Sequence, residues 1–338
     1  MMTVRATLHA AMLSAAVMLA SCVHEMPEDS RRERAVTLSV HHDKDWDRYE
    51  QTVSRADDPR YAARYHFQIF KADDPGKPVR EVEFTRGDVT RGDFSTTLPM
   101  PPGDYVLHAW SDWADKDSKE SYFFDSSDFA NIVYTEPYNG NNELRDAFRG
   151  VTSFTVEETL DAGYSVVASL NMERPLARYE FISTDLVEFL EGEASRGRFS
   201  FSRGDSPADI PSRVPDFGDY TVKMIYTGYM PSVFNNLTNK PVDSATGMSY
   251  EARIDILNDS EARLGFDYVM VNGHESSVAV ALEIYDPDGA LIGRVSPVDV
   301  STKRSRNTVV KGRFLTSKAT GGVGINPGFD GEFNIEIK

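Results

Sequence analysis

The stretch Tyr65-His66-Phe67-Gln68-Ile69 places an apolar side chain at every second position, with polar side chains between them. This period of two is typical of a β-strand that buries one face. The pattern recurs in runs of four to eight residues separated by Gly, Pro, Asp and Asn. It predicts about seven strands in the first half, near the number that one sandwich needs, over residues 36–40, 65–69, 94–98, 105–109, 132–134, 151–156 and 164–170.

A second set of alternating runs begins after Asn171. It covers residues 176–182, 220–226, 250–256, 264–271, 278–285, 291–295, 309–315 and 333–337. Residues 185–190 are predicted to form a short helix, with Thr184 as its N-cap, or a strand that crosses between sheets. Residues 111–149 show no strand pattern apart from 132–134, so we expect a long connection there. The sequence therefore predicts an all-β protein with two β-sandwich domains.

The first 22 residues have the order of features found in a lipoprotein signal peptide. Arg5 is followed by an apolar run over 10–19 and then by Ala20-Ser21-Cys22. The run is too short to span a bilayer, which needs ~20 residues. We expect residues 1–21 to be removed and Cys22 to be lipidated. The alternative is an ordinary signal peptide, or an internal helix in which Cys22 is incidental.

Cys22 is also the single cysteine in the chain, which excludes disulfides and cysteine catalysis in the mature protein. Residues 22–34 are polar, and we expect them to form a lipidated tether. We expect an N-terminal domain over 35–171 and a C-terminal domain over 172–338. Acidic residues close behind a lipidated cysteine resemble the surface-export signal of Bacteroidetes lipoproteins. We therefore expect a lipid-anchored protein of the outer membrane, exposed on the cell surface. The net charge of −17 disfavours nucleic acid as a partner.

Several motifs carry a resemblance to a known family. They are Pro102-Gly103-Asp104-Tyr105-Val106-Leu107-His108-Ala109-Trp110, Arg145-Asp146-Ala147-Phe148-Arg149-Gly150, Arg174-Pro175-Leu176-Ala177-Arg178-Tyr179-Glu180-Phe181, Tyr226-Thr227-Gly228-Tyr229-Met230-Pro231-Ser232-Val233-Phe234-Asn235, and the ending 327–335. Together they resemble the fimbrillin-like proteins of Bacteroidales, closest to a largely uncharacterised lipoprotein branch in which Val-His-Glu and a Pro follow the cysteine. The resemblance implies two tandem transthyretin-like β-sandwiches in proteins that build or anchor type V pili, or adhere at the cell surface.

The mechanism that this resemblance suggests is β-strand addition between fimbrial subunits. The expected donor strand carries Phe333, Ile335 and Ile337 on one face. Since the sequence has no sizeable extension beyond Lys338, it is expected to be a fimbrial anchor, tip or accessory subunit, or a stand-alone surface protein, rather than a polymerising stalk subunit.

No catalytic constellation is present in the sequence. It contains no Gly-x-Ser-x-Gly elbow, no His-Glu-x-x-His and no P-loop. The turn at Ser206 lacks a convincing acid and base partner, and His41, His42, His66 and His108 are interpreted as solvated or edge histidines. We therefore expect no enzyme activity, no catalytic residue and no cofactor.

The connection 111–149 is rich in acidic and aromatic side chains. Asp112, Asp115 and Asp117, with Asp125 and Asp128, are weak candidates for calcium ligands, because the lysines at 116 and 119 interrupt them. Trp110, Trp113, Tyr122, Phe123 and Phe124 are expected to pack in a core or interface; a sugar-stacking platform is the alternative. That alternative predicts a glycan-binding surface lipoprotein of a nutrient-uptake system.

Two short surface motifs remain. Arg-Gly-Asp occurs at 86–88, 91–93 and 203–205, and the last copy, Arg203-Gly204-Asp205, is a possible adhesion motif for a host receptor. The competing interpretation is that Arg-Gly-Asp simply suits β-turns. Asp243-Ser244-Ala245 matches a short O-glycosylation pattern of this bacterial group, with Ser244 as acceptor in an expected polar loop.

Overall fold

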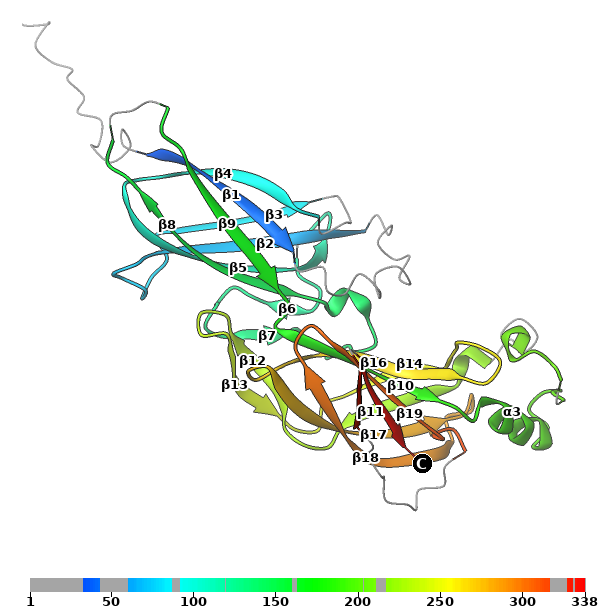
Figure 1. Ribbon diagram of the computed structural model, residues 1–338. Coiled ribbons are helices and arrows are strands. Elements are labelled where there is room, and N and C mark those ends of the chain that lie inside the picture. The colour runs from blue at the N-terminus through cyan, green and yellow to red at the C-terminus, as the bar shows by residue number, and fades with distance from the viewer. Residues whose placement is uncertain are drawn as a thin grey trace, which may run out of the picture.

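The computed structural model describes residues 33–42, 60–86, 92–118, 120–159, 163–202, 204–210, 217–316, 327–330 and 332–337, the last two ranges as backbone alone. It confirms the predicted fold class: the protein is all-β, with two tandem transthyretin-like β-sandwich domains (Figure 1). The predicted alternation explains why, since each run buries every second side chain, as in the pattern of β1 from Arg34 to His42.

The first domain is one seven-stranded sheet in the order β3-β2-β5-β8-β9-β1-β4. Its strands are β1 (Arg34–His42), β2 (Tyr61–Lys71), β3 (Arg80–Arg86), β4 (Phe94–Met100), β5 (Gly103–Asp115), β8 (Phe148–Val156) and β9 (Val166–Glu173). The sheet folds over on itself, because the ring of Phe94 in β4 lies 4.8 Å from Tyr65 in β2 and 6.0 Å from Phe84 in β3. The enclosed core of Val, Leu, Ile and aromatic side chains is buried to a few per cent exposure or less.

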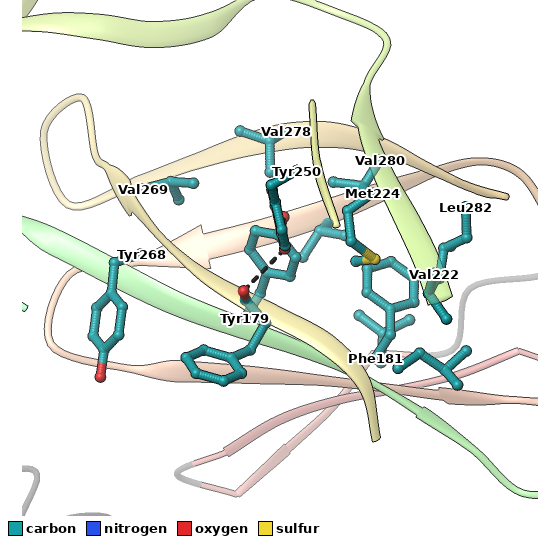
Figure 2. Packing of buried hydrophobic residues seen from close by; sticks show 14 of the residues in the cluster. Tyr179, Phe181, Val222, Met224, Tyr250, Tyr268, Val269, Val278, Val280 and Leu282 are labelled. Carbon is teal, nitrogen blue, oxygen red and sulfur yellow. Dashed lines mark hydrogen bonds between the residues drawn. The ribbon is translucent and has the colours of Figure 1, made fainter. Parts of the chain in front are cut away.

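The second domain has a six-stranded and a four-stranded sheet. The larger follows the order β15 (Asp255–Ile256), β16 (Ala262–Met270), β10 (Leu176–Ser183), β19 (Asn307–Gly312), β21 (Glu332–Ile337) and β20 (Pro327–Asp330). The smaller follows β14 (Ser249–Arg253), β11 (Thr221–Tyr226), β17 (Glu275–Tyr285) and β18 (Leu291–Lys303). Figure 2 shows side chains of both sheets, such as Phe181 and Leu282, meeting in one core.

A small third sheet joins the two domains. Its order is β13 (Lys240–Ala245), β12 (Met230–Asn235), β7 (Ile132–Tyr134) and β6 (Phe124–Asp125). Strands β6 and β7 come from the connection 111–149, whereas β12 and β13 come from the second half of the chain. The connection also sends Phe129 and Leu144 into the core of the second domain. It is therefore a structured link, and the predicted strand at 132–134 is confirmed as β7.

The direction of the strands fixes the two ends of the molecule. Strand β1 runs parallel to β9, with Val36 opposite Val166. Since β9 leads directly into β10 of the second domain, the first residues of β1 lie at the end of the first domain that points away from the second. The helix α3 (Leu186–Ser195) lies on the far side of the second domain (Figure 1). The start of β1 and the helix α3 therefore lie toward opposite ends of the molecule.

Local differences from the prediction have simple causes. The expected helix at 185–190 forms as α3, but its N-cap is Asp185 rather than Thr184. Strand β3 was not predicted, although its partly buried Val82 and Phe84 alternate with the exposed Glu81 and Glu83. The expected strand 250–256 is divided into β14 and β15, which belong to different sheets. Within the described residues, no helix is both long and apolar enough to cross a bilayer.

Candidate functional site

The C-terminal strand β21 lies inside a sheet rather than at its rim. It pairs in parallel with β19, with Val310 opposite Ile335, and antiparallel with β20, with Phe329 opposite Phe333. Strands β20 and β21 form the last hairpin of the chain. Without this hairpin, β19 becomes the edge of the six-stranded sheet, and an edge strand is a template for another strand.

The strand that borders the slot of this hairpin, β19, is buried on both of its faces. Thr308 and Val310 of β19 are fully buried and Val309 is nearly so, and β10 holds β19 in parallel register from the other side. A strand placed there is recognised by main-chain hydrogen bonds at every second residue, and its side chains are sorted between two faces. The predicted donor positions Phe333, Ile335 and Ile337 all fall in β21, in the strand that occupies this slot.

The second notable place is the junction between the domains. Trp110 of β5 is fully buried, and its ring lies 5.4 Å from Phe124 and 6.1 Å from Phe234 of β12. Asn236, also fully buried, donates from Nδ2 to the carbonyl oxygen of Ala109 over 3.1 Å. Side chains of the two domains therefore interlock through a loop that directly follows β12.

A buried ion pair anchors the connection to the second domain. Arg145 Nε lies 2.8 Å from Asp267 Oδ1, and both side chains are at most 1% exposed. Tyr138 and Tyr226 each donate a hydrogen bond to Asp267 Oδ2. Burial alone lowers the pKa of Arg145, but the nearby Asp267 carboxylate overrides this and raises the pKa above its ordinary value.

This ion pair continues into a chain of tyrosine hydroxyls. Tyr179 donates to Tyr226 over 2.8 Å and lies 3.2 Å from the hydroxyl of Tyr250, as the dashed line in Figure 2 marks. Burial first, and the charge of Asp267 second, raise the pKa of Tyr226 well above its usual range. These hydroxyls therefore stay protonated and act as hydrogen-bond donors that satisfy the buried carboxylate.

Three further motif arginines are buried and paired in the same region. Arg174 Nε lies 3.0 Å from Asp146 Oδ2, and Arg178 Nη2 donates to Glu143 over 2.9 Å. Arg149 Nε donates to Asn236 Oδ1 over 3.1 Å. Four of the five motif segments that carry the family resemblance thus meet at or beside this junction. Sequence reasoning missed this junction; the recurrence of arginines in the motif segments was the available signal.

The weak calcium candidates have partners within the protein. Asp112 is buried and accepts two hydrogen bonds of 2.8 Å from Arg64. Asp115 accepts from the backbone N–H of Asp117 and Ser118, and Asp125 and Asp128 close their own turns in the same way. Among the described residues, no three acidic or histidine side chains come together as a metal site.

The aromatic residues of the connection lie mostly in the core, as the favoured interpretation predicted. Trp110 and Phe124 are fully buried and Phe123 is 5% exposed, so the sugar-platform alternative is wrong for these three rings. Tyr122 alone has a large exposed surface, and Trp113 is partly buried. The hydroxyl of Tyr122 donates to Asp115 over 2.8 Å, which raises the pKa of Tyr122 to about 12.

The histidines differ from the sequence-based interpretation. His66 is 3% exposed and packs its ring 4.7 Å from Phe129, so it is a buried residue rather than a solvated one. Its ring nitrogen lies 2.5 Å from Glu81 of β3, and the ring that covers it, Phe129, comes from the connection, which explains why the position in β2 was misread. His108 is half-buried, and burial together with the charge of Arg149 lowers its pKa to about 4. His41 and His42 lie at the end of β1 as expected, but His42 is 8% exposed and lies 3.2 Å from the hydroxyl of Tyr65, so the solvated interpretation is wrong for it.

The surface motifs are only partly covered. Arg203, residues 87–88 and Arg91 lie outside the described residues, as do residues 1–21 and Cys22. Asp205 closes a turn by accepting from the backbone N–H of Ser202 over 2.9 Å, and Gly204 has φ of 113°, a conformation that favours glycine. Ser244 is exposed, but it lies in the edge strand β13 and not in the loop that we expected.

Two tandem transthyretin-like sandwiches, locked together by a junction of buried arginines, define the class of this protein. A family model described as "Family of unknown function (DUF6562)" matches residues 27–338, so the chain belongs to that family. Among curated proteins, none matches this sequence.

Several solved structures are similar to this chain. The fimbrial anchor protein Mfa2 from Porphyromonas gingivalis matches at 12% identity and a TM-score of 0.41, over 78% of this chain and 81% of that chain. The tip fimbrial protein Mfa3 from the same organism matches at 9% and 0.40, over 82% and 94%. A fimbrial assembly protein from Parabacteroides distasonis matches at 10% and 0.38, over 82% and 90%. At TM-scores below 0.5, these likenesses carry no functional argument.

Proposed function

We propose that this chain is a non-enzymatic surface lipoprotein that acts in cell adhesion, as a fimbrial anchor, tip or accessory subunit. Its lipid is attached at Cys22 and holds it in the outer membrane. Its partners are other fimbrial subunits, joined by β-strand complementation at the slot beside β19. The motif resemblance and the attachment of β21 to its sheet through β19 support this proposal.

The observation that carries the proposal is the pairing of the last hairpin. Strand β21 contacts the rest of the described chain's sheets through β19, and β20 contacts them through β21. Among the described strands the hairpin is joined to its sheet through β19, so its departure from the slot would leave every other described pairing intact. A parallel strand from another subunit then finds the same register beside β19.

A cross-linking experiment tests strand exchange directly. In a full chain with Cys22→Ser, which is free of thiols, Val310→Cys is placed in one sample and Ile335→Cys in another. These residues are direct partners in the β19 and β21 register. When the samples are mixed and oxidised, we expect a disulfide-linked dimer on a non-reducing gel.

Two matched controls make the outcome decisive. The first control mixes Val310→Cys with Phe333→Cys. Because Phe333 pairs with Thr308, these two cysteines are two positions out of register, and we expect less dimer. The double variant Val310→Cys with Ile335→Cys in one chain should close an internal disulfide. An internal disulfide in the double variant with no dimer in the mixed sample would show that β21 stays in its own sheet, and would refute the proposal.

The glycan-binding alternative has lost its main support. Three of its five aromatic rings are buried in the core or the junction and cannot stack on a sugar. No described feature favours a nutrient-uptake role over the adhesive one.

A further inference from the structure

A cleft lies beside the start of α3, in the part of the second domain that faces away from the first. Its volume is about 550 Å³. Three segments that are distant in sequence form it: the beginning of α3, the turn at residues 204–207, and the turn between β15 and β16 at Asp259 and Ser260. A cleft of this size accommodates a small organic group and is larger than a metal ion requires.

The floor of the cleft is apolar. Phe201 is 8% exposed, Pro207 is buried, and Val187 of α3 is partly buried against the core of the domain. An aliphatic stem of a ligand gains free energy by covering these side chains, in proportion to the apolar area removed from water. A polar ligand alone would leave this surface unused.

The rim of the cleft is acidic. Glu188 comes from α3, Asp205 from the second segment and Asp259 from the third. Glu188 lies 3.3 Å from Arg313, and Asp259 accepts a long hydrogen bond of 3.4 Å from Ser206. Within the described part of the chain, three such groups do not converge on an ion-sized position. Separated carboxylates suit an extended organic cation rather than a metal ion.

We propose that this cleft binds a primary ammonium or guanidinium group carried on an aliphatic stem. The stem covers Phe201 and Val187 while the cation pairs with Asp259 at one side of the rim and is attracted at longer range by Glu188 at the other. The net charge of −17 draws such a ligand toward the protein over long range. The same chemistry is supplied by a lysine or arginine side chain of a partner protein or by a free polyamine. This site is separate from the β19 slot, so it does not depend on strand exchange.

Binding is measured by titration calorimetry on the full chain with Cys22→Ser. The probes are acetyl-Gly-Lys-Gly-amide, acetyl-Gly-Arg-Gly-amide and spermidine, with acetyl-Gly-Gln-Gly-amide as the neutral comparison. We expect saturable binding of at least one cationic probe and none of the glutamine peptide. Binding of a peptide identifies a protein side chain as the source, and binding of spermidine alone identifies a free polyamine. Absence of saturable binding for all three cationic probes would overturn the proposal.

Substitutions locate the site. Asp259→Asn and Glu188→Gln should each weaken binding by up to about fivefold, the range of one partly exposed ion pair. Asp299→Asn removes the same charge on the exposed face of β18 and should leave binding unchanged. Equal weakening by Asp299→Asn and Asp259→Asn would show a long-range charge effect and contradict a bound cation in the cleft. Unchanged melting temperatures confirm that each variant is folded.

The apolar floor has its own test. Replacing lysine in the peptide by 2,3-diaminopropionate keeps the ammonium group and removes three methylenes. Binding should weaken by at least about fivefold, because the stem no longer covers Phe201 and Val187. Equal binding of the two peptides would show that the floor takes no part, and would contradict the proposed stem contact.

Discussion

The domain junction and the C-terminal hairpin hold their strands in place in opposite ways. The junction joins side chains as far as 129 positions apart in the sequence, such as Tyr138 with Asp267, and 87 apart for Arg149 with Asn236. Its charged groups are buried and paired. The hairpin is joined to the rest of its sheet through one neighbouring strand, β19. The junction is held by buried, paired charges, whereas the hairpin is the element that we propose is replaced by an equivalent strand.

The difference follows from the kind of bond that each region uses. A buried charge pair is costly to break, because an unpaired charge in a low-dielectric interior is strongly unfavourable. Main-chain hydrogen bonds at a sheet edge can be remade with any strand of suitable pattern. A surface protein that exchanges a strand under load needs both properties: a fixed relation between its domains and one exchangeable element.

The largest expected effect comes from breaking the junction. Arg145→Ala leaves Asp267 buried without its cation, and should lower the free energy of unfolding by about 4 kcal/mol. Urea denaturation followed by tryptophan fluorescence measures this. Arg313→Ala is the matched control: its side chain is 59% exposed beside Glu188, so the loss should stay below about 1 kcal/mol. Equal losses in the two variants would contradict the proposed role of the junction.

A smaller expected effect is the pH dependence of stability that His108, beside the junction, contributes. Burial, together with Arg149, lowers the pKa of His108 to about 4, from an ordinary value of 6.5. A lowered pKa means that the folded state favours neutral His108. The stability contribution is therefore complete above pH 6.5 and is lost as the pH falls toward 4.

The comparison of two variants isolates this histidine from the titrating carboxylates. Between pH 7 and pH 5 the chain with His108 should lose about 1 kcal/mol more stability than His108→Gln, after discounting for solvent screening of a half-buried group. Thermal or urea unfolding at the two pH values gives this difference. An identical loss in both chains would show that His108 titrates normally and lies outside the influence of the junction arginine.

Features that depend on residues close together in the sequence could be predicted, whereas features that depend on distant residues could not. Alternating runs such as Tyr65 to Ile69 depend on near neighbours, so the strands and the all-β class could be predicted. The burial of His66 could not, because Phe129, which covers it, lies 63 positions later in the chain. Strand β3 was missed because two apolar side chains, Val82 and Phe84, are a short signal, although they alternate with Glu81 and Glu83. The cleft beside α3 was also invisible, because its three segments meet only after folding.

The candidate sites show the same limit. The C-terminal alternation at Phe333, Ile335 and Ile337 marked a strand correctly, but its neighbour β19 and the parallel register came from the structure. The arginine motifs were visible as repeated sequence patterns. Their partners, Asp267, Asn236 and Glu143, were not, because nothing local to the arginines specifies which distant acid or amide they meet.

Amide hydrogen exchange on the folded chain tests the central claim most directly, namely that the last strand is exchangeable while the junction is permanent. The account predicts that amides of β21, over Glu332–Ile337, exchange at least about a hundredfold faster than those of β10, over Leu176–Ser183. Such a difference means that β21 opens locally without global unfolding. Equal protection of the two strands would show that β21 leaves only when the whole domain unfolds, and would contradict the account.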